Sequence, residues 1–236
     1  MFRLVVIALG LLFFPFANAQ NPEHLAQEAY LQALKHIVQA RSAISDGRSI
    51  AFVEISENRT GSQKTKQRQL RLNEHGNEVL YPKVKPSDED ELINWQSSIM
   101  VEPNRFPKQA KLIRETKSTW ILSIPTTVSA KIDESNQEVD SSKINKRIQS
   151  SLVTELTVSK QSPRFLALKV FAKKPFNPEA MVKVHEFIVR FEFAEAWSGG
   201  PLITRTVSKV LTGSYAFFID IEAFSITRYE QFQIVN

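Results

Sequence analysis

The sequence predicts an α+β protein in which a long antiparallel meander forms a curved sheet or an unclosed β-barrel, covered by an N-terminal amphipathic helix and short helices. Three observations predict this fold class. Apolar residues recur at helical spacing within residues 21–46, and strand-like runs separated by short polar turns fill the C-terminal half. The longest runs alternate apolar and polar side chains, as strands with one buried face do.

The chain begins with a pattern typical of a cleavable secretory signal peptide. Arg3 precedes an uncharged apolar run from Leu4 to Phe16, and Ala17-Asn18-Ala19 forms a small-x-small cleavage site before Gln20. The apolar run is shorter than the ~20 residues that a spanning helix needs. We therefore expect cleavage of residues 1–19, and a single mature domain, residues 20–236, that does not span a membrane.

The composition limits the cellular compartments in which this chain is expected and the kinds of site it can form. The chain contains no cysteine, which excludes a disulfide, a thiolate nucleophile and a cysteine-ligated metal. An exported chain without disulfides fits a bacterial periplasm better than a eukaryotic extracellular space. The net charge of +5 is a mild basic excess, so we expect no nucleic acid as a partner.

A helix is expected at the start of the mature chain, over residues 21–46. Asn21 is a suitable N-cap, Pro22 suits the first helical position, and Asp46-Gly47 suits the end. One face of this helix carries the apolar stripe Leu25, Ala29, Ala33, Leu34, Ile37, Val38 and Ile44.

The segment between this helix and residue 150 mixes strands with polar connections. A hairpin is expected from Ile50–Ile55 and Leu70–Leu72, a short helix from Ser87, and a strand over Thr119–Ile124. Residues 131–150 carry few large apolar side chains and are interpreted as a flexible polar connection. A weak helix with one i, i+4 stripe fits them equally well.

The C-terminal part reads as successive antiparallel strands. They are expected at Leu152–Val158, Phe165–Phe171, Val182–Phe193, Leu202–Leu211 and Tyr215–Phe232, with turns at residues 162–163, 175–178, 198–201 and 212–214. Alternation places Phe187, Val189, Phe191 and Phe193 on one buried face. In the last hairpin it gives Tyr215, Phe217, Ile219 and Ile221 the same pattern.

No residue pattern points to catalysis. None of the four histidines, His24, His36, His75 and His185, stands at a metal-ligand spacing from another ligand, and no GxSxG element occurs. The loop Ser198-Gly199-Gly200-Pro201 is interpreted as a hairpin turn. We therefore expect no enzyme, no metal and no cofactor.

Basic residues cluster in the first hairpin. Lys64, Lys66 and Arg68 alternate with uncharged residues, so their side chains are expected to share a face that could contact an anionic lipid or an acidic partner. The alternative is an edge strand whose lysines prevent aggregation.

The order of these elements resembles the LolA-like superfamily of periplasmic lipoprotein carriers and related proteins. The resemblance rests on the overall layout, on Ser118-Thr119-Trp120-Ile121 leading to Pro125, and on the closing hairpin from Pro201 to Val235. It implies an unclosed β-barrel covered by helices, with an apolar face that holds acyl chains. The residues expected to line such a face here are Trp120, Leu122, Phe187, Phe191, Phe193, Phe217 and Ile219.

Two functional hypotheses follow. The first is a non-catalytic periplasmic carrier or binding protein for an apolar ligand, such as a lipid acyl chain or a lipoprotein. The second is a cell-envelope adaptor or scaffold that binds another envelope protein through a sheet edge and the basic hairpin.

Overall fold

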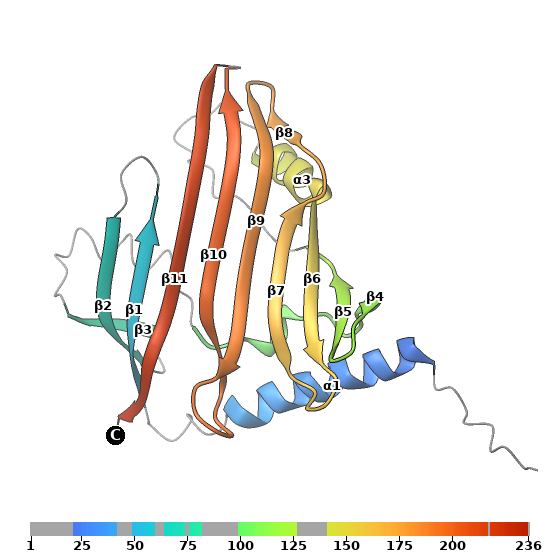
Figure 1. Ribbon diagram of the computed structural model, residues 1–236, viewed down its shortest axis with the longest axis vertical. Coiled ribbons are helices and arrows are strands. Elements are labelled where there is room, and N and C mark those ends of the chain that lie inside the picture. Colours follow the sequence, from blue (N-terminus) through green and yellow to red (C-terminus); the bar gives the residue numbers. More distant parts are fainter. Residues whose placement is uncertain are drawn as a thin grey trace, which may run out of the picture.

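One antiparallel sheet of eleven strands dominates the computed structural model (Figure 1), which describes residues 21–41, 49–59, 64–73, 76–81, 99–126, 141–216 and 218–235. Its order is β3-β2-β1-β11-β10-β9-β7-β6-β5-β4, with β8 paired to β9. The strands are β1 (Ser49–Asn58), β2 (Lys64–Asn73), β3 (Gly76–Tyr81), β4 (Lys111–Glu115), β5 (Thr119–Ile124), β6 (Leu152–Ser159), β7 (Phe165–Ala172), β8 (Phe176–Glu179), β9 (Val182–Glu195), β10 (Leu202–Tyr215) and β11 (Ile219–Val235). Over the described strands β3 and β4 form the two ends, so the predicted unclosed antiparallel sheet is confirmed.

The predicted antiparallel meander is confirmed for the C-terminal strands, and the first hairpin joins them through a pairing that was not predicted. Consecutive strands pair along β4-β5-β6-β7 and along β9-β10-β11, whereas β1 pairs with the last strand, β11. This long-range pairing joins the first described strand to the last. The short strands β3, β4 and β8 were not predicted, and β8 occupies the segment that was expected to be a turn.

The turn predicted at residues 212–214 is wrong. Strand β10 continues to Tyr215, which pairs across the hairpin with Ile219, so these two residues do not lie on one strand. The backbone N–H of Ala216 donates to the carbonyl of Met181 (2.8 Å), which links the β10–β11 turn to the β8–β9 turn. Gly213 serves a close approach between strands, because a Cβ there would lie 2.5 Å from the Lys183 carbonyl oxygen.

Helix α1 (Pro22–Arg41) covers one end of the sheet, at the bottom of Figure 1. Asn21 caps it as predicted, since its Oδ1 accepts the N–H of Glu23 at 3.0 Å. Its buried side chains are Ala26, Ala29, Tyr30, Ala33 and Ile37. They pack on Trp120, Leu122, Leu156, Val158 and Phe165 of the sheet. Val38 was predicted in this stripe but is 58% exposed, and residues 42–46 lie outside the described part.

Tyr30 is the largest side chain that α1 buries. Its ring stacks on Phe165 with centroids 5.7 Å apart, and its hydroxyl donates to the carbonyl of Pro107 (2.5 Å). Burial raises the pKa of Tyr30 to about 12, because the phenolate would lose its hydration there. Tyr30 therefore fastens α1 both to the sheet and to the chain that follows η2 (Pro103–Arg105).

The polar stretch before β6 is partly helical. Helix α3 (Ser141–Ser151) packs against β8 and β6, with Ile144 and Ile148 half-buried. The helical alternative is thus confirmed for this part. Residues 131–140 and the helix expected from Ser87 lie outside the described residues. Among the described helices, none is long and apolar enough to cross a membrane.

Candidate binding face of the sheet

The sheet has two faces, and α1 packs on only one of them. We call it the helix face and the opposite one the outer face. Directly paired residues of neighbouring strands point to the same side, so register carries the helix face across the whole sheet. One row of this face is Leu122, Leu156, Leu168, Phe191, Val207, Thr227, Ser56 and Lys66.

Solid core fills the α1 end of the helix face. One cluster joins α1 to β5, β6 and β7, and a second contains Ile50, Phe52, Leu70, Leu72, Ile203 and Tyr229 with Ile99. In the second cluster the ring of Phe52 stacks on Phe232 and meets Tyr229 edge-on. These two clusters hold the strands together below the region where β9, β10 and β11 rise beyond α1 (Figure 1).

The residues expected to line an apolar ligand divide into groups on this face. Trp120 and Leu122 are buried in the core under α1, and Phe193 packs against that same core. Phe187 and Phe191 are half-buried further along β9 and point to the helix face. Ile219 is 49% exposed at the start of β11. Phe217 lies outside the described residues.

The basic residues of the first hairpin also lie on the helix face. Lys64, Lys66 and Arg68 pair with Asn58, Ser56 and Glu54 of β1, so the prediction that they share a face is confirmed. Arg68 is engaged inside the protein, because it binds the buried carboxylate of Glu54. Beyond them, the Ser56 and Thr227 hydroxyls are hydrogen-bonded at 3.1 Å.

Lys209 is a functional candidate that the sequence analysis missed. It lies on β10 between Val207 and Leu211, two apolar residues of the helix face, and its cross-strand neighbours are Val189 and Ser225. Burial lowers the pKa of Lys209. A lysine at an inward position of an alternating strand is the signal that could have identified it.

The outer face has a different character. Its charged residues pair with one another, as in Arg228 with Glu57 and Arg190 with Glu192 (3.0 Å). Next to these pairs, a row of half-buried apolar residues crosses the outer face: Phe224, Val210, Ile188, Phe171 and Val153. The ammonium of Lys169 lies 4.6 Å from the centroid of the Phe171 ring.

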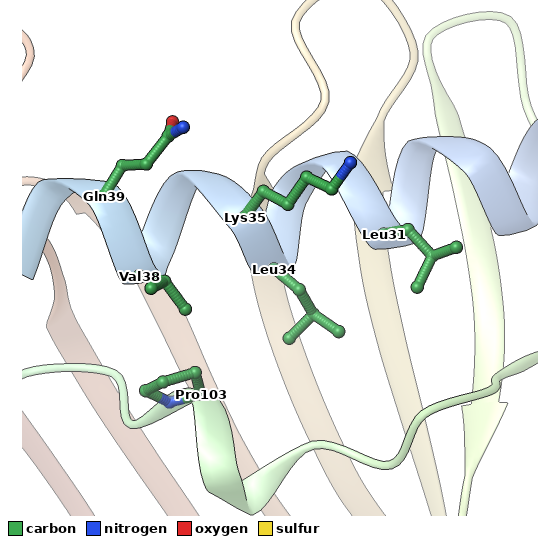
Figure 2. A pocket seen from close by; sticks show the side chains of 6 residues that line it. All are labelled: Leu31, Leu34, Lys35, Val38, Gln39 and Pro103. Carbon is green, nitrogen blue, oxygen red and sulfur yellow. The ribbon is translucent and has the colours of Figure 1, made fainter.

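A groove lies between α1 and the chain segment of Pro103. Figure 2 shows Leu31, Leu34 and Val38 pointing toward the chain segment of Pro103, while Lys35 and Gln39 extend on the opposite side of the helix. Its volume is about 480 Å³ and its walls are almost wholly apolar. The groove is open and shares no residue with the helix face of the sheet.

The described residues offer no arrangement for metal binding. Within the part of the chain that the structure describes, no group of three or more histidine, aspartate or glutamate side chains could hold an ion. His24 and His36 instead lie beside Glu28 (3.6 Å) and Glu195 (3.8 Å). His185 is exposed on β9, and His75 lies outside the described residues.

Fold and site together define a helix-covered, unclosed antiparallel sheet whose helix face changes from apolar to cationic across its width. No protein-family model and no curated protein matches the chain. Among solved structures, it is similar to a LolA superfamily protein from Nitrosomonas europaea, with 9% sequence identity and a TM-score of 0.36. The similarity covers 89% of this chain and 94% of that one. This is the superfamily that the layout of the sequence resembles.

Proposed function

We propose that this chain is a non-catalytic binding protein that carries an apolar ligand, such as the acyl chain of a lipid or lipoprotein, on the helix face of its sheet. We further propose that it acts in the periplasm after removal of residues 1–19. One observation carries the proposal: the helix face continues along β9 beyond the core, and its aromatic side chains there are only half-buried.

The position of α1 explains why this part of the face differs from the core. The helix packs against β4, β6 and η2, and the residues beneath it, such as Leu122 and Leu156, are fully buried. Phe187 and Phe191 lie on the same face but belong to neither core cluster, and each keeps part of its surface exposed. Half-buried phenylalanines offer apolar area without a polar group, which suits a hydrocarbon chain.

The first test separates a binding surface from ordinary core. We expect Phe191→Ala to lower the free energy of unfolding by only about 1 kcal/mol, since little buried area is lost. Leu122→Ala, in the solid core, should cost about 2–5 kcal/mol because it leaves a cavity. Phe191→Ala should also weaken binding of a fluorescent fatty acid, measured by titration of the same sample whose stability is measured in urea.

The matched control is Phe171→Ala, which removes a half-buried phenylalanine from the outer face of the same sheet. It should leave fatty-acid binding unchanged. Equal loss of binding in the Phe171 and Phe191 variants, or no binding by the unmodified protein, would contradict the carrier proposal.

The adaptor hypothesis has one structural feature in its favour. Strand β3 pairs only with Gln69–Asn73 of β2, so among the described strands the segment Lys64–Arg68 is paired on one side alone, with β1. An extended segment of an envelope protein could add to this edge by backbone hydrogen bonding. A proline at Lys66 would block such addition, so loss of a copurifying protein in Lys66→Pro with retained fatty-acid binding would favour the adaptor.

A further inference from the structure

The two faces of strands β2, β1, β11 and β10 differ in the sign of their charges. Arg205 lies at a register shift of β10, where no cross-strand partner fixes its face, and its guanidinium carbon is 4.9 Å from the centroid of the Phe232 ring. On the helix face the charged residues are Glu54, Lys64, Lys66, Arg68 and Lys209. On the outer face they are Glu57, Asp220, Glu222, Glu230, Arg71 and Arg228. The acids of these strands thus lie mostly outside, and the cations mostly on the helix face.

Among the described residues of these four strands, the single acid on the helix face is already paired with a cation. Glu54 is buried, and its carboxylate accepts a hydrogen bond from the Arg68 Nε at 2.9 Å. Lys64, Lys66 and Lys209 therefore leave this half of the helix face with a net positive charge over the described residues. Such a face attracts anions, and more strongly where burial lowers the local dielectric.

One row of residues places these cations beside the apolar half of the same face. Pairing across the sheet gives Lys64, Asn58, Ser225, Lys209, Val189, Val170, Thr154 and Ile124. Three strand spacings of roughly 4.8 Å separate Lys64 from Lys209, and only the polar side chains of Asn58 and Ser225 lie between them. On the other side of Lys209 the row becomes mainly apolar.

From this row we infer that the ligand is an anionic amphiphile, whose carboxylate or phosphate is held between Lys209 and the pair Lys64 and Lys66, while its hydrocarbon chain lies over Val189, Phe191 and Phe187. The inference rests on the proposed function, since it specifies the chemistry of the ligand on that same face. The lysine ammonium groups and the Asn58 amide supply donors to the anion, and charge-assisted hydrogen bonds are the stronger kind.

The state of Lys209 agrees with this assignment. Its pKa is lowered because burial removes water from the ammonium group. An anionic group placed beside it would compensate that desolvation and favour the charged form. A neutral ligand offers the ammonium group no opposite charge, so the site should distinguish the two.

The experiment compares ligands with one chain length and different heads. Palmitate, palmitoyl lysophosphatidic acid and the neutral hexadecanol are titrated calorimetrically, below their critical micelle concentrations, into the mature protein. We expect both anions to bind more tightly than hexadecanol, with an advantage that falls as salt is added. The order of palmitate and lysophosphatidic acid shows whether a carboxylate or a phosphate fits better.

The test variant is Lys209→Gln, and its matched control is Lys169→Gln, which removes the same charge from the outer face. Lys209→Gln should weaken binding of the anions roughly tenfold, as expected for one charge-assisted hydrogen bond, and leave hexadecanol unchanged. Lys169→Gln should alter neither. The double variant Lys64→Gln/Lys66→Gln, at exposed positions, should reduce the anion preference without affecting folding.

The outcomes separate this inference from the proposed function. Equal affinity for hexadecanol and palmitate, or equal effects of Lys209→Gln and Lys169→Gln, would overturn the anion site while the carrier function stands. Failure of all three ligands to bind would overturn both.

Discussion

Glu54 is a buried carboxylate that is held by hydrogen bonds inside the protein. It is 2% exposed, on a face where Phe52 and Ile50 precede it in the second core cluster. Its carboxylate accepts hydrogen bonds from Arg68, and Ser56 Oγ lies 3.4 Å from the same oxygen. A buried ion pair adds little net stability, but removing one partner leaves a charge without compensation.

We therefore expect Arg68→Met to be strongly destabilising. The free energy of unfolding, measured in urea, should fall by about 3–5 kcal/mol because the buried carboxylate of Glu54 loses the Arg68 guanidinium. The control is Arg228→Met, which breaks the pair with Glu57 on the outer face, where the arginine is 40% exposed. That change should cost less than ~1 kcal/mol.

A double variant distinguishes charge from packing. Glu54→Leu combined with Arg68→Met removes both charges and should recover most of the stability lost in Arg68→Met. A double variant no more stable than Arg68→Met alone would contradict this account of the pair.

At the scale of elements, local pattern predicted the long strands and missed the short ones. Thr119–Ile124 was predicted at its observed bounds, because its alternation reflects one buried face. β4 has five residues, most of them exposed, and β8 has four and contains Pro178. Neither strand therefore shows the alternation of apolar and polar residues that identifies a strand with one buried face. The pairing of β1 with β11 is decided by contacts far apart in sequence, which no local pattern reports.

At Gly213, local composition predicted a turn that the contact between strands rules out. Thr212-Gly213-Ser214 has turn composition, yet β10 runs through it because the glycine admits the backbone of β9 at a register shift. We expect Gly213→Ala to lower the free energy of unfolding by about 1–3 kcal/mol, since a Cβ would press on the Lys183 carbonyl. The measurement is urea denaturation.

The neighbouring Thr212→Ala is the control for this prediction. Thr212 pairs with Glu186 on the outer face, so its truncation should change stability by less than ~1 kcal/mol. If the two variants were equally stable, the close approach of β9 at Gly213 would not be the reason for the glycine.

At the scale of the whole molecule, the candidate site was only partly predictable. Alternation along β9 placed Phe187 and Phe191 on one face, which the pairing confirms. Trp120 and Leu122 share that face. They lie in solid core because α1 packs over them, and local sequence does not predict this tertiary contact. Lys209 was missed because a single cation among alternating apolar residues looks like an exception until the register places it on the same face as Lys64 and Lys66, three strands away.

Different residues of the helix face form the core clusters and the proposed binding region. Core beneath α1 and around Phe52 stabilises the sheet, so the region of Phe191 need not be closed for the protein to fold. The cations on β2 and β10 then border that region without opposing acids, except Glu54, among the described residues of these strands. Under the proposed function, stability and ligand binding depend on different residues, and variants should affect them independently.

The periplasmic location proposed for the mature chain depends on export. Cleavage after Ala19 would remove the apolar leader and leave Asn21, which caps α1 through the Glu23 N–H. The mature protein would then keep the described contacts of α1, because the helix begins at Pro22. We expect the protein recovered from a bacterial periplasmic fraction to have the intact mass of a chain whose first residue is Gln20. Ala19→Arg should block cleavage, because the site requires a small residue there, and leave the uncleaved chain with the membrane fraction. Recovery of the unmodified protein with residues 1–19 attached would contradict the signal-peptide assignment.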